Sequence, residues 1–419
     1  MQASPTPLKV LLCGACMSGN MGGPALYLGM QEAFRLLEVP VEITVLSKYP
    51  RDDAAPCAAA GWSMIAFSST RQLTLGAPLS VLYASLRMLG LMPRRSRVDF
   101  MQAVLHHDVL IDLSGISFTD DRDVSGLVIN VLWLLPALAT GLPVVKAAQA
   151  MGPFRRPLVR WVSRWVLSRV AALAARGAES AAHVRALLPT RSVPHLDDLA
   201  FLMPPATPDE VEHALADLAL TGERGYCVLA PSLAVYHMAN AEQRERYVAL
   251  YAELARHAED QYGLEVLLLP HERAHGGAAV DDLMVCEQVL ARAPERRWAV
   301  LRRAVSAPLL KGLVGGAELA LGSRFHFMVA AMGSGVPGIA IGWSHKYREM
   351  MEAFEQGQRA IDFRVATSSE IAAQLDSLWQ ERVAIRASLR ARGVTVRERA
   401  GQNAVLAIAA ARRAGHTVS

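Results

Sequence analysis

Short apolar segments alternate with helix-length segments along almost the whole chain, and this alternation constrains the fold more than any other feature. Each apolar segment has the length of a buried strand, and enough residues follow it for a helix that returns across the sheet. The pattern predicts an α/β protein with parallel sheets covered by helices on both faces. The expected strands are Val10–Gly14, Val41–Leu46, Ser63–Phe67, Val109–Leu113, Val144–Ala148, Ala171–Ala175, Cys227–Pro231, Glu265–Leu269, Trp298–Leu301, Glu318–Leu321 and Gly338–Gly342.

A proline-rich segment, Met203–Pro208, interrupts this alternation and stiffens the connection between its two halves. A chain of 419 residues is long enough for about two domains. We therefore expect two Rossmann-like domains facing across a cleft, which is a usual place for a ligand. The expected boundaries are 1–205 for the N-terminal domain, 206–366 for the C-terminal domain and 367–419 for a tail of helices broken near Gly393.

Composition excludes several classes of protein. Lys plus Arg is 43 and Asp plus Glu is 39, and a net charge of only +4 argues against a dedicated nucleic-acid binder. The five cysteines are odd in number and scattered, which indicates a reducing compartment. Cys13 and Cys16 have redox or metal spacing, but no second pair lies nearby, so two thiols in a glycine-rich turn are the favoured interpretation. The N-terminus leads directly into a strand without a secretory signal, which predicts a cytoplasmic protein.

The most apolar run, Leu127–Val145, is interrupted by Pro136 and Gly141. A bilayer requires about 20 apolar residues without such breaks. We therefore expect a buried helix to Ala139, a turn, and then the strand Pro143–Ala148.

Two basic segments leave a peripheral membrane contact, at the inner face of the membrane, open as an alternative. Arg156, Arg160 and Arg164 lie four residues apart and so share one face of a predicted helix. The segment Leu79–Leu91 is followed by the arginine-rich Pro93–Arg97. Each segment is explained either by a solvated basic face or by contact with a lipid surface.

The stretch Gly322–His326 indicates an anionic ligand. It places Arg324 and His326 two residues apart, where a short strand should turn into a helix of small residues. Helix N-termini at the carboxyl ends of parallel strands are common sites for phosphates and carboxylates. The alternative is an arginine that fixes its own loop and a histidine in a packed turn.

Other candidates lie where the remaining strands end. A glycine-rich loop follows the first strand and leads to Pro24, which suits the first turn of a helix. Structural turns explain most of these positions about as well as ligand contacts do. The candidates are Asn20 and Gly22 in that loop, Ser114 and Gly115 after the fourth strand, Gln149 after the fifth, and Arg176 after the sixth, which could bind a carboxylate or pair with Glu179.

The second half adds groups that could transfer protons. His271 ends a predicted strand and could act as an acid or base near neutral pH. Asp281 and Asp282 follow at the start of a predicted helix, where carboxylates are favoured by the helix dipole. Lys346 follows the last predicted strand and adds a cation.

Taken in order, these motifs resemble the polysaccharide pyruvyl transferase family over residues 10–362. The resemblance rests on Asn20-Met21-Gly22, Ser114-Gly115, Gln149–Pro153, Arg176 with Ser180, Asp198–Phe201, Leu269-Pro270-His271, Asp281-Asp282, Ser323–His326, Gly335-Val336-Pro337 and Lys346. Gly23, Ser114 and Leu199 depart from the family pattern, which bears mainly on the acceptor.

The resemblance implies a GT-B-like fold and transfer of a pyruvyl group from phosphoenolpyruvate onto two hydroxyls of a sugar, forming a ketal. It implies no cofactor and no metal ion, because arginines can neutralise the leaving phosphate. The acceptor would be a glycan or glycolipid precursor, either free or lipid-linked, and a homo-oligomer is left open. By similarity, Arg176, Arg324 and His326 would hold the donor, with Lys346 as a helper. The other substrate-binding residues would be Asn20, Gly22, Ser114, Gly115, Gln149 and Phe325. The catalytic residues would be His271, His326 and, more weakly, Asp282.

Removing the Arg324 side chain is then expected to abolish activity with little effect on thermal unfolding.

Two other functions remain as alternatives. One is a nucleotide-sugar glycosyltransferase of the same architecture, whose 323–337 loop would hold a diphosphate. The other is a non-catalytic partner in glycan assembly, which Gly23 keeps open because the family has an aspartate there.

Overall fold

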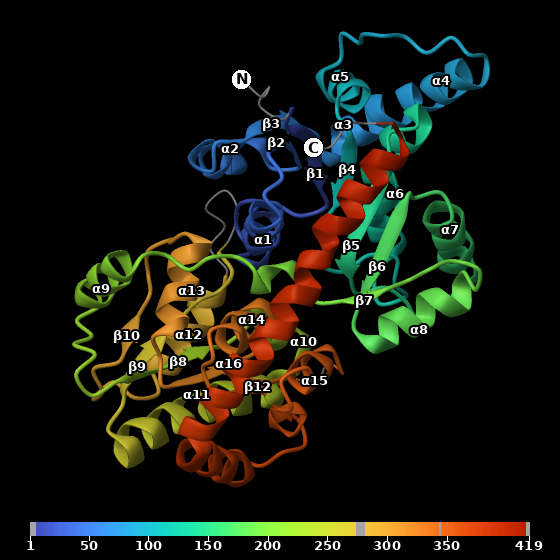
Figure 1. The fold of residues 1–419 in the computed structure, drawn as a ribbon. Helices are drawn as coiled ribbons and strands as arrows, with labels where there is room; N and C mark the ends of the chain where they lie inside the picture. Colours follow the sequence, from blue (N-terminus) through green and yellow to red (C-terminus); the bar gives the residue numbers. More distant parts are fainter. Residues whose placement is uncertain (1–5, 274–280, 343–344, 416–419) are drawn as a thin grey trace. The chain divides into compact units, whose positions relative to one another are not determined.

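The chain forms two compact α/β units, which we call unit 1 and unit 2 (Figure 1). The computed structural model describes residues 6–273, 281–342 and 345–415. Unit 1 comprises residues 1–18, 26–203 and 397–419, and unit 2 comprises residues 19–25 and 204–396. The main division therefore falls inside the proline-rich segment, while the grouping also assigns residues 19–25 to unit 2 and shares the predicted tail between both units.

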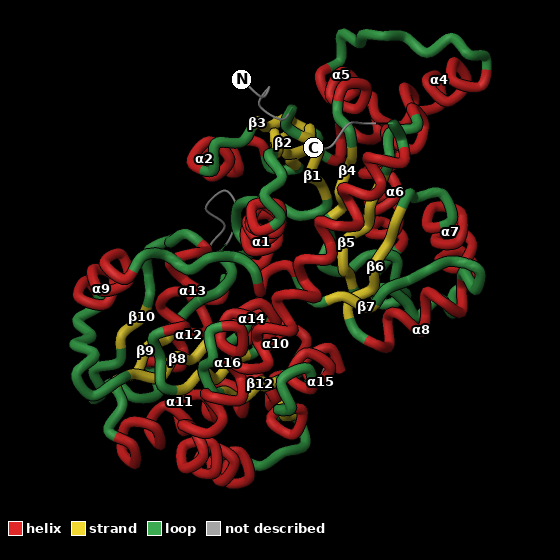
Figure 2. Tube along the Cα trace, in the orientation of Figure 1, coloured by secondary structure: helices red, strands yellow, loops and turns green. Residues whose placement is uncertain are grey.

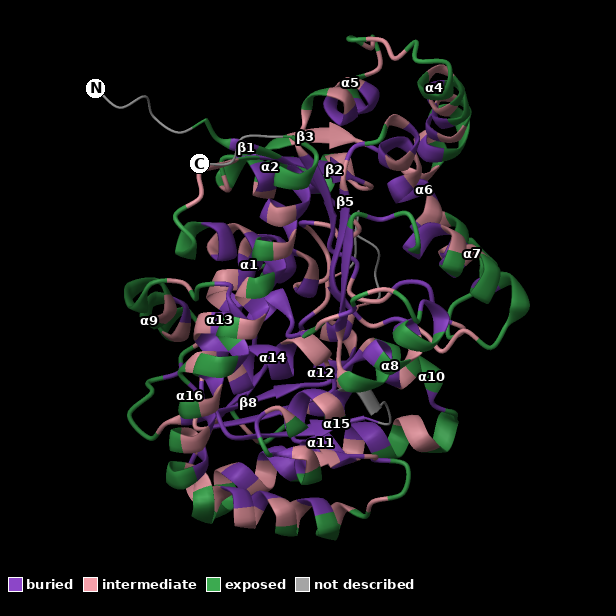
Figure 3. Ribbon diagram, turned by 45° about the vertical axis from the view of Figure 1, so that its right-hand side comes forward, coloured by how far each residue is buried: buried purple, intermediate pink, exposed green. Residues whose placement is uncertain are grey.

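Unit 1 contains a parallel sheet with the strand order β3-β2-β1-β4-β5-β6-β7. Its strands lie between helices and are mostly buried (Figures 2 and 3). The strands are β1 (Leu8–Cys13), β2 (Val41–Ser47), β3 (Ser63–Ala66), β4 (Val109–Asp112), β5 (Val144–Gln149), β6 (Ala172–Arg176) and β7 (His195–Leu196). The two-residue β7 was not predicted, because so short a segment carries no periodic signal.

Side chains that alternate along these strands form separate cores on the two faces of the sheet. Leu11 and Leu110 belong to the core that includes residues of α4 to α8. Val10 and Val109 belong to the core that includes residues of α1, α2 and the last part of α16. The helical elements here are α1 (Gly22–Leu36), α2 (Pro50–Ala59), α3 (Ser69–Arg71), η1 (Gln72–Gly76), α4 (Ala77–Met88), α5 (Asp99–His106), α6 (Val124–Thr140), α7 (Pro157–Leu167), α8 (Ala178–Leu187) and η2 (Leu199–Phe201).

Unit 2 contains a second parallel sheet with the order β10-β9-β8-β11-β12-β13. Its strands are β8 (Tyr226–Ala230), β9 (Glu265–Leu268), β10 (Ala299–Val300), β11 (Leu319–Gly322), β12 (Gly338–Ile341) and β13 (Ala360–Ile361). Its helical elements are α9 (Pro208–Asp217), α10 (Leu233–Met238), α11 (Ala241–Tyr262), α12 (Asp282–Leu290), α13 (Ala307–Gly315), α14 (Phe325–Gly333), α15 (His345–Glu352), η4 (Gly357–Arg359) and the first part of α16 (Ser368–Arg413). All eleven predicted strands are present to within two residues at each end, and two Rossmann-like α/β domains are confirmed.

The predicted helix break near Gly393 is wrong. α16 runs without interruption from Ser368 to Arg413. A glycine inside a helix costs about 1 kcal/mol relative to alanine. The buried small residues Ala400, Ala404 and Ala407 pack into the second core of unit 1, and this packing offsets the weak propensity.

The apolar run Leu127–Val145 forms the helix and strand that its proline and glycine predicted. α6 ends at Thr140 and is capped by Gly141, whose φ of 91° lies in the left-handed region, and β5 begins at Val144. Among the residues that the structure describes, no helix combines the length and hydrophobicity needed to cross a bilayer.

Candidate functional site

The carboxyl ends of three neighbouring strands in unit 2 bring most of the candidate residues together. β9, β8 and β11 are adjacent in the sheet, so the loops that follow them meet at one edge. His271 follows β9 and Arg324 follows β11, as predicted. Asp282, the first residue of α12, lies between them because its carboxylate bonds to residues of all three loops.

Arg324 is held by two carboxylates. Its Nε lies 2.9 Å from Oδ2 of Asp282, and its Nη2 lies 2.5 Å from Oδ1 of the same residue, which makes a bidentate pair. Its remaining terminal nitrogen, Nη1, forms an ion pair with Glu272. Asp282 is fully buried, whereas the Glu272 side chain is 39% exposed. Sequence reasoning missed Glu272, because an acidic residue beside a candidate anion site carries no obvious signal.

Asp282 is a hydrogen-bonding centre of this cluster. Besides the arginine, it accepts hydrogen bonds from the backbone N–H groups of Leu233 at 2.8 Å, His271 at 3.2 Å and Glu272 at 2.8 Å. Together with the two bonds from Arg324, these bonds occupy both carboxylate oxygens. The weaker prediction of a catalytic role for Asp282 stays a prediction.

His271 is a buried imidazole next to positive charge. His271 is only 3% exposed to solvent. Burial lowers the pKa of His271 well below its usual value of 6.5, and the charges of His326 and Arg324 lower it further. The imidazole is therefore neutral at pH 7, and a neutral imidazole fits a proton acceptor better than a proton donor.

The glycine-rich loop packs directly on this cluster. Residues 19–25 belong to unit 2, where Asn20 pairs with Glu272 in an antiparallel bridge. The Met21 N–H donates to the carbonyl of His271 at 3.4 Å. Asn20 Oδ1 accepts from the N–H of Gly22 at 2.8 Å and so shapes the turn. A Cβ atom on Gly22 would lie 2.1 Å from Nδ1 of His326. The backbone at Gly22 therefore packs so closely against the imidazole that no larger residue fits without a shift.

Buried hydroxyls fix the loop that carries Arg324. Ser323 shares a hydrogen bond of 2.7 Å with Tyr251, and its carbonyl accepts from Tyr347 at 2.7 Å. The half-buried Phe325 packs edge-on against His326, with ring centroids 5.3 Å apart. Lys346 lies in α15, but its side chain is outside the described residues, so its predicted role stays a prediction.

Arg176 lies in unit 1, at the end of β6 as predicted. Its Nη1 forms an ion pair with Asp198, which is almost fully buried and which the sequence analysis did not name as a partner. Asp198 also accepts from the N–H of Ala200 at 2.9 Å and caps η2, as expected of a structural aspartate. That Arg176 and Arg324 converge on one donor stays a prediction.

The candidates after β4 and β5 form a buried polar network in unit 1. Ser114 donates to Asp112 at 2.7 Å, and Asp112 forms an ion pair with Lys146, which the register of β4 and β5 places opposite it. Gln149 is fully buried, donates to the Asp112 carbonyl at 2.6 Å and accepts from Ser117 at 2.6 Å. Gln149 and Ser114 thus support the loop.

Gly115 differs from these two neighbours, because a Cβ atom there would meet nothing within 4 Å. It stays a candidate for contact with a ligand. Lys146 was missed by sequence reasoning, although a charged residue within an apolar strand is a signal that a buried partner exists.

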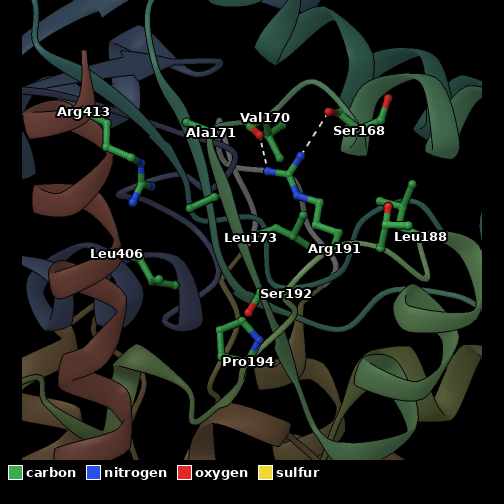
Figure 4. A pocket seen from close by; sticks show the side chains of 12 residues that line it. Ser168, Val170, Ala171, Leu173, Leu188, Arg191, Ser192, Pro194, Leu406 and Arg413 are labelled. Atoms are coloured by element: carbon green, nitrogen blue, oxygen red, sulfur yellow. Dashed lines mark hydrogen bonds between the residues drawn. The ribbon is translucent and has the colours of Figure 1, made fainter.

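A cavity of about 670 Å³ in unit 1 lies elsewhere (Figure 4). Its lining includes Val170 to Leu173 at the amino end of β6, which is the opposite end of the strand from Arg176. Arg191 lines this cavity, and its guanidinium group donates hydrogen bonds to the carbonyl of Ser168, at 3.0 Å, and to the carbonyl of Val170. This cavity contains none of the predicted site residues.

Comparison with known families decides the class of the protein. The model of the polysaccharide pyruvyl transferase family matches residues 20–345, which include every candidate residue of unit 2 except Lys346. The chain belongs to the polysaccharide pyruvyl transferase family. Polysaccharide biosynthesis and transferase chemistry follow from that membership.

One relative is similar to this chain over most of the length of both sequences. The amylovoran biosynthesis protein AmsJ of Erwinia amylovora is 22% identical over 391 residues, covering 88% of this chain and 92% of AmsJ. Among solved structures, the UDP-GlcNAc 2-epimerase of Neisseria meningitidis bound to UDP-GlcNAc has a TM-score of 0.58 at 9% identity, covering 97% of this chain and all of that one.

A putative UDP-N-acetylglucosamine 2-epimerase of Listeria monocytogenes has a TM-score of 0.57 at 10% identity, covering 98% of each chain. At these identities the likeness concerns the fold alone, and it agrees with the GT-B-like two-domain class.

Proposed function

We propose that this protein transfers the pyruvyl group of phosphoenolpyruvate onto two hydroxyls of a sugar in a polysaccharide or glycolipid precursor. The observation that carries the proposal is the cluster of Arg324, His271 and His326 at the carboxyl edge of the unit 2 sheet, in a chain of this family. Phosphoenolpyruvate has a phosphate and a carboxylate, and a guanidinium held by Asp282 can receive either anion.

Glu272 supports this interpretation as a replaceable partner of Arg324. The carboxylate of Asp282 is fully buried, whereas the carboxylate of Glu272 is 39% exposed. An anionic group of the donor can take the place of Glu272 on Nη1 without disturbing the buried pair. The arginine is therefore oriented before the donor binds, and little reorganisation remains to be made.

The reaction balances with groups of this cluster. A proton added to C3 of the donor makes C2 cation-like, and a sugar hydroxyl bonds to C2 as it loses its proton. The bond between C2 and the phosphate oxygen breaks, and phosphate leaves with the electron pair. The second hydroxyl then bonds to C2, and its proton passes to the departing phosphate. We assign proton acceptance to the neutral His271 and proton donation to His326, which lies beside it.

The donor itself assists this assignment. Its negative charges would offset those of Arg324 and His326, which lower the pKa of His271 in the free protein. The pKa of His271 should therefore rise towards neutrality when the donor binds, which makes the imidazole a stronger base in the complex than alone. Arg176 of unit 1 remains the proposed second cation for the donor.

The test measures phosphate release from phosphoenolpyruvate with and without candidate acceptor sugars, together with the mass of the sugar. Acceptor-dependent release and a gain of one ketal-linked pyruvate support the proposal. Binding of a UDP- or GDP-sugar without any response to phosphoenolpyruvate would support a glycosyltransferase instead.

Substitution of Arg324 tests whether phosphoenolpyruvate reacts at the cluster of Arg324, His271 and His326. Arg324→Lys keeps a cation beside Asp282 but loses the fork, so it should reduce kcat/KM for the donor by about a hundredfold. Arg303→Lys is the matched control, because Arg303 pairs with Asp217 on the surface of the same unit. Equal effects of the two substitutions would remove Arg324 from the donor site.

A further inference from the structure

One helix of unit 1 exposes the kind of side chain that is normally buried. Large apolar residues are exposed throughout the segment that runs from η1 through α4 to the loop beyond it. They are Leu73 (55% exposed), Leu75 (42%), Val81 (67%), Leu82 (51%), Met88 (89%), Leu89 (70%) and Leu91 (63%). Large exposed apolar side chains that gather on one segment mark an interaction site in a folded protein.

The helical spacing gathers four of these side chains on one side of α4 and the residue after it. Val81 and Leu82 are followed seven residues later by Met88 and Leu89, so the four share a face. Tyr83 is buried on another face and belongs to the core that α4 shares with α6. Figure 3 shows the exposed residues of α4 in green. The helix is thus held in place by one side while its apolar face stays open.

Positive charge accompanies this segment of the sequence, and no acidic residue lies within it. The sequence contains no Asp or Glu from Ala54 to Val98, whereas it contains five arginines there. Arg87 lies on α4, and Arg94, Arg95 and Arg97 lie in the loop that leads to α5, all four being exposed. Arg71, the fifth, is paired with Asp99.

We propose that this surface, residues 73–97 and here called the α4 surface, docks on a membrane that contains anionic lipid. An amphipathic helix with apolar residues on one side and nearby arginines buries the apolar side chains at the level of the headgroups. The arginines are attracted by the negative surface potential of the leaflet. Both features of the α4 surface are needed for such a contact, and both are present in one segment.

A second copy of the chain fits this surface less well than lipid does. In a two-fold contact the same patch meets itself. Such a contact would bring the arginines of two copies together in a segment that has no acidic residue to pair with them. An anionic lipid surface supplies the missing negative charge. The inference does not depend on the proposed reaction, since it concerns a different part of unit 1 from Arg176.

The experiment measures co-flotation of the full chain with vesicles of phosphatidylcholine alone and of phosphatidylcholine mixed with phosphatidylglycerol. Binding should require phosphatidylglycerol and should weaken as salt is raised. The triple variant Val81→Gln, Met88→Gln and Leu89→Gln should reduce partitioning at least about tenfold. Reversal of Arg94, Arg95 and Arg97 to Glu should reduce it on the order of a hundredfold.

Matched controls separate the α4 surface from general hydrophobicity and charge. Met238→Gln, Val365→Gln and Val383→Gln remove three equally exposed apolar residues of unit 2. Arg224→Glu, Arg297→Glu and Arg397→Glu make the same change in net charge at exposed positions outside the segment. Both control triples should bind vesicles as the unchanged protein does.

Three outcomes would overturn the proposal. The first is no binding to either kind of vesicle, and the second is equal loss in the control and α4-surface triples. The third is self-association in solution that the glutamine triple at the α4 surface abolishes, without vesicle binding, which would make this surface an interface between copies. Thermal unfolding of each variant checks that the surface substitutions leave the fold intact.

Discussion

The imidazole of His326 occupies the space where a residue other than glycine at position 22 would place its Cβ atom. A Cβ atom on Gly22 would lie 2.1 Å from Nδ1 and 2.6 Å from Cε1 of the ring. The loop that contains Gly22 also bonds to the carbonyl of His271 through Met21. The glycine-rich loop thus sets the position of one candidate catalytic histidine and contacts the backbone of the other.

Gly22→Ala should therefore displace either the loop or His326. We expect kcat to fall by about a hundredfold, because a shift of about 1 Å at a reacting group costs that much. The free energy of unfolding should fall by about 1–3 kcal/mol from overpacking. Steady-state kinetics with phosphoenolpyruvate and chemical denaturation measure the two effects.

Gly401→Ala is the control for this substitution, since a Cβ atom at Gly401 in α16 would meet nothing within 4 Å. It should leave activity unchanged and stabilise the helix by about 0.5–1 kcal/mol. An active Gly22→Ala enzyme would mean that the ring of His326 can move aside without consequence.

Asp282→Asn tests the buried pair with Arg324. The substitution leaves a buried guanidinium with only a neutral partner on that side, and breaking a buried pair costs about 3–5 kcal/mol. For the same reason Arg324→Ala should destabilise the protein, contrary to the expectation from sequence that unfolding would hardly change. Denaturant titration measures the loss directly.

The comparison is Asp362→Asn, which removes a carboxylate from the partly exposed pair with Arg364. Surface pairs of that kind contribute about 0–1 kcal/mol. Similar losses for both substitutions would show that Asp282 contributes no more than a surface carboxylate.

Glu272→Gln should strengthen donor binding. Glu272 neutralises the one nitrogen of Arg324 that Asp282 leaves available, so an anionic donor must compete with it. Removing its charge should lower the KM for phosphoenolpyruvate by roughly tenfold, on the order of one exchanged charge-assisted hydrogen bond. A raised KM would instead place Glu272 among the groups that help to bind the substrates.

Glu287→Gln controls for the loss of an acidic side chain, because Glu287 pairs with Arg302 at an exposed position of the same unit. The KM of this variant should be unchanged. Initial rates over a range of phosphoenolpyruvate concentrations, at fixed acceptor, distinguish the two variants.

Most of the fold could be predicted from the sequence because each strand is a separate apolar segment. The failures came where a tertiary contact decides the local structure. Gly393 looked like a helix break, yet the buried alanines that follow it hold α16 together. The pair of residues in β7 forms a strand only because β6 offers an edge to pair with.

The sequence predicted which residues lie at the strand ends of the candidate site, but it did not predict which of these residues bond to one another. Arg324, His271 and Asp282 could be placed at one edge of a sheet from their positions in the sequence. That Asp282 holds the arginine and Glu272 occupies its last nitrogen depends on distances across loops. Sequence spacing does not determine such distances.

The pH dependence of stability tests the environment of His271. Burial and the charges of His326 and Arg324 hold its pKa well below 6.5 in the folded protein, whereas the unfolded chain keeps the usual value. Below pH 6.5 the unfolded state therefore binds a proton that the folded state does not, and stability is lost as the pH falls, by up to about 1.4 kcal/mol per pH unit. His271→Asn should remove this part of the slope between about pH 6.5 and pH 5.

Denaturation midpoints measured at several pH values check this prediction. The control is His213→Asn, at an exposed position, and its slope should match that of the unchanged protein. Equal slopes for all three proteins would mean that His271 takes up its proton as easily in the folded state as in the unfolded one, and the neutral imidazole on which the proton-acceptor role depends would be lost.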